Sequence, residues 1–174
     1  MQPDFFMRKI GISAAVLVLT CAAGWSQVGA TVFQQGSTRL SLNVGYGSLN
    51  GNDYFIAGAG VGYYIYNGLE AGLDGDAWAG SKPHIYEVSP RLTYVFYQLD
   101  YPFKPYLGGL YRRTFYDTMK SVDSAGGRAG IISPIGEHTY LSAGLVFENY
   151  FHCDTHLYSS CSQVYPELGL AFSY

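Results

Sequence analysis

The last eleven residues of the chain, from Val164 to Tyr174, alternate strictly between two faces. One face is apolar and consists of Val164, Pro166, Leu168, Leu170, Phe172 and Tyr174. A period of two predicts a β-strand with one apolar face. The apolar face continues to the final residue, and an open strand edge of this kind would promote aggregation of a soluble protein. A closed barrel in a membrane has no open edge, so this strand favours a membrane barrel.

The first thirty residues have the pattern of a secretory signal peptide. A basic Met7-Arg8-Lys9 precedes the apolar run Ile10–Ala23, and Val28-Gly29-Ala30 offers a cleavage site with small residues. The apolar run is shorter than the roughly 20 residues that a membrane-spanning helix needs. We expect residues 1–30 to be a cleaved signal peptide and residues 31–174 to be one barrel domain. Whether translation starts at Met1 or Met7 stays open.

A second processing route would cleave before Cys21 and attach a lipid to it. It fits less well, because a small residue usually precedes that cysteine and Thr20 stands there.

The composition agrees with a membrane barrel. Charged residues make up 13% of the chain and aromatic residues 17%, with 22 glycines. Low charge with many aromatic residues and glycines is typical of barrels in which lipid-facing and lumen-facing positions alternate. The formal net charge of −3 gives no argument for nucleic-acid binding, so we expect no nucleic-acid partner.

Seven further segments predict strands, over residues 38–47, 53–66, 69–79, 85–98, 103–116, 124–135 and 139–150. The alternation is least clear over residues 103–116, where Tyr106, Gly108 and Leu110 fit either face. With residues 164–174 they make eight strands, most of them long enough to cross a bilayer at a tilt. The predicted fold class is all-β, an eight-stranded antiparallel up-and-down transmembrane β-barrel that follows a cleaved signal peptide.

The connections between these segments indicate an orientation. Short turns follow the second, fourth and sixth segments, at Asn67-Gly68, Leu99–Pro102 and Pro134–His138, whereas longer polar connections follow the third, fifth and seventh. Short turns are typical of the periplasmic side, so both termini of the barrel are expected there. Aromatic residues gather near both predicted ends of the strands, as the two interfaces of a bilayer select. They are Tyr63, Tyr64, Tyr66, Phe96, Tyr97, Tyr101, Phe103, Tyr140, Phe172 and Tyr174 at one end and Tyr46, Tyr54, Phe55, Tyr111, Phe115, Tyr116, Phe147, Tyr150 and Phe151 at the other.

The whole mature chain resembles the small eight-stranded outer-membrane barrels, the group that includes OmpX and the transmembrane domain of OmpA. The resemblance is carried by the architecture, by the aromatic C-terminal strand, and by the short segments Gly68–Leu73 and Lys104–Gly109. It implies location in the bacterial outer membrane with periplasmic termini, and contact with outer-membrane lipid and lipopolysaccharide. It also implies that Leu168, Leu170, Phe172 and Tyr174 form the signal read by the barrel assembly machinery.

Charged residues fall on the predicted inward faces of several strands. They are Glu70, Asp74, Asp76, Arg91, Arg128, Glu148 and Glu167, with Arg112 or Arg113 in addition. A narrow eight-stranded lumen is filled by side chains, and buried charges must pair. We therefore expect an ionic network that plugs the lumen; an ion path is the alternative.

Cys153 and Cys161 lie in the longest predicted outer loop, where exported thiols oxidise, and we predict a disulfide between them. His152, Asp154 and His156 lie beside them, but their spacing matches no compact zinc pattern, so no metal or cofactor is expected.

The predicted role is structural or surface-interacting, without catalytic residues. Three alternatives stay open: a lipid A-modifying enzyme, a narrow pore, and a soluble lipocalin-like binder. For the enzyme, His156, Ser159 and Ser160 lie in the outer loop, and His138 and Ser142 lie near the opposite rim. A base and a serine nucleophile would be needed close together near the outer leaflet. The lipocalin-like binder would place its apolar face inside.

Overall fold

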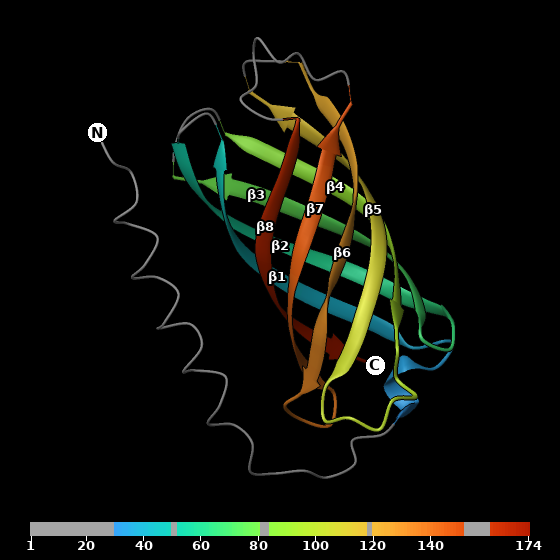
Figure 1. Ribbon diagram of the computed structural model, residues 1–174. Coiled ribbons are helices and arrows are strands. Elements are labelled where there is room, and N and C mark those ends of the chain that lie inside the picture. The colour runs from blue at the N-terminus through green and yellow to red at the C-terminus, as the bar shows by residue number, and fades with distance from the viewer. Residues whose placement is uncertain (1–29, 50–51, 81–83, 118–119, 152–160) are drawn as a thin grey trace.

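The computed structural model is a closed barrel of eight antiparallel strands (Figure 1). It describes residues 30–49, 52–80, 84–117, 120–151 and 161–174. The strands are β1 (Thr38–Leu49), β2 (Asn52–Tyr66), β3 (Leu69–Ala79), β4 (Ile85–Val95), β5 (Lys104–Tyr116), β6 (Val122–Pro134), β7 (Thr139–Tyr150) and β8 (Ser162–Ser173). A short 3₁₀ helix, η1 (Ala30–Phe33), precedes β1. In the described parts of the chain, no helix is long and apolar enough to cross a membrane.

Each strand pairs with its neighbour in sequence, and β1 pairs with β8 to close the barrel. The β1–β8 register aligns Arg39 with Ser173 and Leu42 with Leu170. The predicted fold class is confirmed in strand number, order and closure. The predicted signal peptide lies outside the described residues, apart from Ala30.

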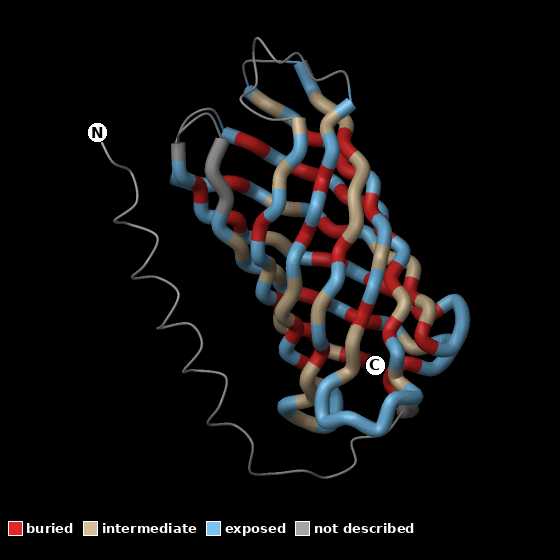
Figure 2. The backbone as a smooth tube through the Cα atoms, in the orientation of Figure 1, coloured by how far each residue is buried: buried red, intermediate tan, exposed pale blue. Residues whose placement is uncertain are grey.

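Buried and exposed residues alternate along the strands (Figure 2). On β1, Leu40, Leu42 and Val44 point outward and are about half exposed, at 44%, 53% and 44%. Arg39 and Ser41 lie on either side of Leu40 in sequence and are buried inside. Because successive strand residues point to opposite faces, the apolar set covers the outside of the barrel and the polar set fills it. This is the reverse of a soluble ligand-binding barrel.

The strand ends differ slightly from the sequence prediction. β4 ends at Val95 instead of residue 98, and β8 begins two residues earlier, at Ser162. The turn at Asn67 and Gly68 joins β2 to β3 as predicted. Gly68 has a positive φ of 77°, which a residue with a side chain rarely adopts. A Cβ atom there would also lie 2.8 Å from the carbonyl oxygen of Val95.

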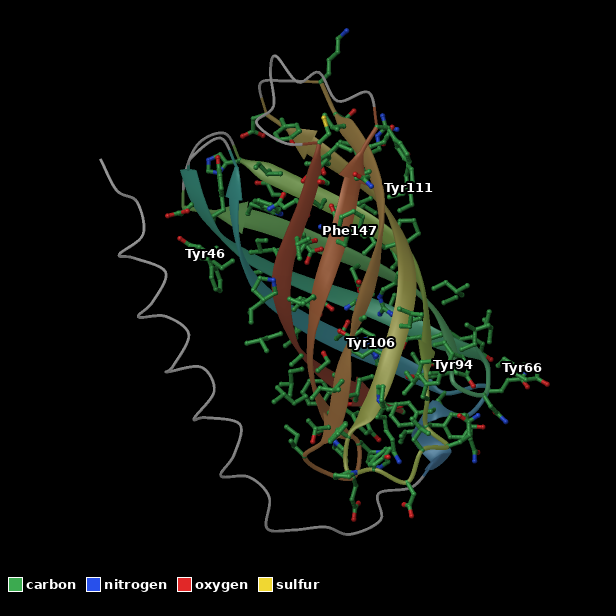
Figure 3. All side chains as sticks on the ribbon, in the orientation of Figure 1. Tyr46, Tyr66, Tyr94, Tyr106, Tyr111 and Phe147 are labelled. Atoms are coloured by element: carbon green, nitrogen blue, oxygen red, sulfur yellow. The ribbon has the colours of Figure 1, made fainter. Side chains whose placement is uncertain are left out.

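The barrel has two different ends. We call the end with the β1–β2, β3–β4, β5–β6 and β7–β8 connections the loop end, and the other the termini end. Outward aromatic residues gather at both: Figure 3 shows Tyr46, Tyr111 and Phe147 toward the loop end and Tyr66 and Tyr94 toward the termini end. The prediction was wrong for the side chains of Tyr54, Tyr64 and Tyr140, which are buried inside the barrel, and for that of Tyr116, which packs against the buried cluster of Tyr54 and Trp78. Their parity along the strands places them on the inward face.

The segment before β1 folds into the termini end. Val32 and Phe33 are buried there, and the Phe33 ring lies 5.9 Å from the ring of Tyr64 and 5.6 Å from that of Tyr140. The amide of Gly68 donates to the carbonyl of Phe33 at 2.7 Å, and the hydroxyl of Ser173 donates to the carbonyl of Val32 at 3.3 Å. The segment therefore covers this end of the lumen.

Candidate functional site: the ionic lumen

Six charged side chains form a balanced cluster in the half of the lumen nearer the termini end. They are Arg39, Glu70, Asp74, Arg91, Arg128 and Glu167. The carboxylate oxygens of Glu70 lie 3.1 Å from a guanidinium nitrogen of Arg39 and 2.5 Å from one of Arg91. Asp74 binds the Nε of Arg91 at 2.8 Å and Arg128 at 3.3 Å, and Arg128 also pairs with Glu167. Three cations thus face three carboxylates, contributed by β1, β3, β4, β6 and β8.

A second, acidic cluster lies nearer the loop end and is built around Arg112 of β5. The guanidinium contacts Glu148 at 2.7 Å, Glu87 at 3.1 Å and, more distantly, Asp76 at 3.9 Å. It also donates to the hydroxyl of Ser89 at 2.7 Å and to that of Tyr165. Tyr165 in turn donates to Glu148 at 2.7 Å. A single cation therefore holds three carboxylates together.

Glycine makes room for the balanced cluster. A Cβ atom on Gly62 would lie 1.9 Å from the carboxylate of Glu70, and one on Gly60 would lie 1.9 Å from that of Asp74. A Cβ on Gly72 would lie 2.7 Å from the guanidinium carbon of Arg91. The long ionic side chains therefore cross the lumen over positions that carry no side chain. This explains part of the high glycine content.

The lumen is closely filled between these groups. The space enclosed by Arg39, Tyr106 and Arg128 is too small to admit a water molecule. Tyr106 donates to Glu167 at 3.2 Å, and the guanidinium of Arg128 lies 5.8 Å from the centre of its ring. Ionic and aromatic groups thus occupy the middle of the barrel together.

The structure places all six residues of the predicted network, Glu70, Asp74, Arg91, Arg128, Glu148 and Glu167, inside the barrel. They belong to two clusters, because Glu148 joins Arg112 and the other five lie in the balanced cluster. Asp76 is also inside, and of the two candidate arginines Arg112 points inward. Arg113 points outward, with 53% of its side chain exposed.

Arg39 and Glu87 complete the clusters but were not predicted. Both lie on the inward faces of their strands, because Arg39 is two residues before the inward Ser41 and Glu87 is two residues before the inward Ser89. Counting the alternation through to both ends of each strand would have found them.

The other candidate residues are not assembled into a site. Ser142 is buried, and its hydroxyl donates to the carbonyl of Gly169 at 3.2 Å, whereas His138 is exposed. His152, Asp154, His156, Ser159, Ser160 and Cys153 lie outside the described residues, so the Cys153–Cys161 disulfide stays a prediction. In the part of the chain that the structure describes, no group of three histidine, cysteine or acidic side chains could hold a metal ion.

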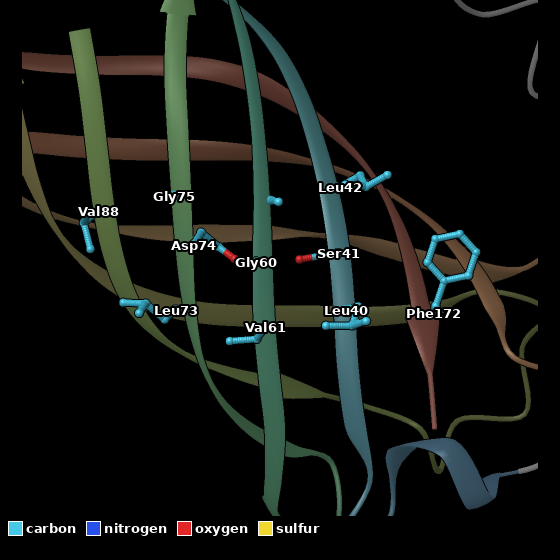
Figure 4. A pocket seen from close by; sticks show the side chains of 11 residues that line it. Leu40, Ser41, Leu42, Gly60, Val61, Leu73, Asp74, Gly75, Val88 and Phe172 are labelled. Atoms are coloured by element: carbon cyan, nitrogen blue, oxygen red, sulfur yellow. The ribbon is translucent and has the colours of Figure 1, made fainter.

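The outer wall carries a shallow apolar groove across β1 to β4 (Figure 4). Its volume is about 550 Å³. Ala59 and Gly75 leave it open between larger side chains, which include Leu42, Val61 and Val88. The groove lies on the apolar face of the strands, and the two polar residues that border it, Ser41 and Asp74, are buried.

No protein-family model and no curated protein matches the sequence. Solved structures do match the fold. The N-terminal β-barrel domain of Pseudomonas aeruginosa OprF aligns with a TM-score of 0.62 at 16% identity, over 80% of this chain and 98% of that one. Neisserial surface protein A, NspA, aligns with a TM-score of 0.59 at 17% identity, over 79% and 96% of the two chains. The outer membrane protein OprG from Pseudomonas aeruginosa aligns with a TM-score of 0.50 at 11% identity, over 81% and 97%.

At these identities the likeness concerns the fold. The strand number, the closure and the antiparallel order agree with the resemblance that the sequence shows. This chain therefore has the fold of the small eight-stranded outer-membrane β-barrels.

Proposed function

We propose that this protein is an outer-membrane barrel of a Gram-negative bacterium, with its termini in the periplasm. The observation that carries the proposal is the inverted burial of the strands. Leu42, Val61, Leu107 and Leu145 are each more than half exposed, while Arg91 and Glu70 are almost fully buried. Lipid chains can cover such an apolar exterior, and the closed barrel leaves few strand edges exposed to them.

Within that membrane the protein acts as a structural or surface-interacting barrel that does not conduct ions. Two ionic clusters cross the lumen, and Phe33 covers its termini end. Opening a path would require breaking buried ion pairs, which costs about 3–5 kcal/mol for the loss of one partner. The loop end is then the part of the molecule that other molecules reach from outside.

Two partner classes follow from this location. Lipid and lipopolysaccharide contact the apolar wall. The barrel assembly machinery reads the last strand, where Leu168, Leu170, Phe172 and Tyr174 share the outward face.

Folding in detergent tests the membrane assignment. We would purify residues 31–174, fold them with and without detergent, and compare circular dichroism and gel mobility before and after boiling. A membrane barrel requires detergent to fold, shows a β-type spectrum, and changes mobility on boiling. A folded, soluble protein in the absence of detergent would contradict the assignment.

A further inference from the structure

The closing seam of the barrel ends before its strands do. The β1–β8 register runs from Arg39–Ser173 to Gly45–Glu167 and stops there. β1 nevertheless continues to Leu49, and β8 begins at Ser162. Each stays paired on its other side, since Ser48 aligns with Asp53 of β2 and Val164 aligns with Phe147 of β7. The loop-end parts of β1 and β8 run apart in Figure 1.

Proline explains where the seam ends. Thr38 and Tyr174 exchange two backbone hydrogen bonds of 2.9 Å each. This exchange sets the phase of the ladder, that is, which residue pairs along β1 and β8 bond directly to each other. In an antiparallel ladder every second pair exchanges such bonds, so Tyr46 and Pro166 would be the next exchanging pair after Val44 and Leu168. Proline has no N–H to donate, and the carbonyl of Tyr46 therefore receives no bond from it.

Another proline of the barrel shows a milder effect. The β4–β5 pairing omits Ser89 and Pro90, but it resumes at Val88–Arg113. β4 and β5 are paired on both sides of Ser89 and Pro90, at Val88–Arg113 and at Arg91–Leu110, so the two strands stay together there. The seam has no such second anchor among the described residues, because no β1–β8 pairing follows beyond Gly45–Glu167.

We call the two separated edges, Tyr46–Leu49 and Gln163–Pro166, the seam notch. The Gly45–Glu167 pair is flanked by the Tyr46 N–H and the Pro166 carbonyl, so these two groups meet at the base of the notch. The same phase directs the backbone N–H and C=O groups of Ser48 and Val164 toward the notch, together with the carbonyl of Tyr46. Tyr46 and Val164 point outward beside it, and their side chains are 56% and 61% exposed. Tyr46 aligns with Phe55 in the loop-end aromatic group, so the notch opens at the level of the outer interface.

We propose that the seam notch binds an extended segment of a partner polypeptide, which adds to the sheet as a short strand. A peptide backbone supplies donors and acceptors that pair with an exposed strand edge. An acyl chain supplies neither. Alternating apolar side chains on the peptide would lie against Tyr46 and Val164. This inference rests on the proposed outer-membrane location, because it gives the notch access to partners outside the cell.

The test measures binding of a fluorescein-labelled peptide, Thr-Val-Thr-Val-Thr-Val-Thr-Lys, to the mature protein in lipid nanodiscs. A second peptide of the same sequence, N-methylated at alternate residues, keeps the side chains but cannot form the ladder. Pro166→Val restores the missing donor and is expected to extend the seam. Pro90→Val is the matched control, since it changes the same residue type in a gap that is already anchored on both sides.

We expect the wild type and Pro90→Val to bind the first peptide, and Pro166→Val to bind it at least about tenfold more weakly, a difference of about 1.4 kcal/mol. The N-methylated peptide should not bind. Absence of binding to wild-type protein that shows the heat-dependent gel shift, or unchanged binding by Pro166→Val, would overturn the inference while leaving the membrane barrel intact. Concentration-dependent dimers that Pro166→Val abolishes would assign the notch to a second copy instead. Failure of the gel shift itself would refute the proposed function.

Discussion

At the scale of single residues, Arg112 is the side chain on which the acidic cluster depends. It is the one cation within 4 Å of Asp76, Glu87 and Glu148 among the described residues. Replacing it with leucine would leave three buried carboxylates without their partner. We expect Arg112→Leu to lower the free energy of unfolding by about 3–5 kcal/mol, measured by urea denaturation in lipid vesicles.

Arg113→Leu is the control for that substitution. Arg113 is adjacent in sequence but points outward, and its distance to Asp123 is 3.9 Å. An exposed pair of this kind contributes about 0–1 kcal/mol. Equal losses from the two substitutions would show that the acidic cluster contributes nothing particular to stability.

Gly144 tests how closely the lumen is packed. A Cβ atom there would lie 2.2 Å from the hydroxyl of Tyr106 and 2.7 Å from the carbonyl oxygen of Ala129. Gly144→Ala should therefore destabilise the barrel by about 1–3 kcal/mol through overpacking. Gly109→Ala offers the comparison, because its nearest atom is the carbonyl oxygen of Gly126 at 3.8 Å. A smaller effect at Gly144 than at Gly109 in the same denaturation assay would be inconsistent with the packing described.

The residues inside the lumen could be predicted from parity, but their partners could not. Glu70, Asp74 and Arg128 are inward in both the sequence pattern and the structure. Which carboxylate meets which arginine depends on the register between neighbouring strands. The periodicity of one strand gives no information about that register. Arg112 and Arg113 stayed ambiguous because Tyr106, Gly108 and Leu110 mix aromatic, small and aliphatic residues on one face of β5.

At the scale of elements, the segment before β1 behaves as a plug. Phe33 is 6% exposed and packs among Tyr64 and Tyr140. Phe33→Ala should cost about 3 kcal/mol in the free energy of unfolding, at the lower end for a buried aromatic residue. It should also speed hydrogen exchange of the backbone amides at the termini ends of β2 and β8.

Gln34→Ala is the matched control, because Gln34 is the next residue and is exposed. It should leave both the stability and the exchange rates near those of the wild type. Unchanged exchange in Phe33→Ala would mean that the segment does not seal this end.

The strand pattern made most elements predictable, because an apolar face opposite a polar or glycine-rich one repeats in most strands, β5 being the exception. The predicted bounds of residues 69–79 and 139–150 are the observed ones. The plug and the seam notch could not be foreseen. Val32 and Phe33 show no periodicity of their own, and the end of the seam appears only when β1 and β8 are placed in register.

At the scale of the whole molecule, the outer wall should be sensitive to charge according to its depth in the bilayer. Leu42 lies in the middle of β1, is 53% exposed, and borders the outer groove. Leu42→Arg should destabilise the protein by about 2–4 kcal/mol in lipid vesicles, as an arginine near the bilayer midplane does. Leu99→Arg changes an exposed residue of the β4–β5 connection and should cost only about 0–1 kcal/mol. Equal effects would contradict a wall that spans the hydrocarbon.

The most direct test of a sealed membrane barrel is the ionic current through the folded wild-type protein in a planar lipid bilayer. Buried ion pairs across the lumen and Phe33 at the termini end predict no discrete conductance steps from protein whose folding has been verified by its heat-dependent gel shift. Steady, uniform channel openings by that same protein would contradict the account and make a narrow pore the better description of this barrel.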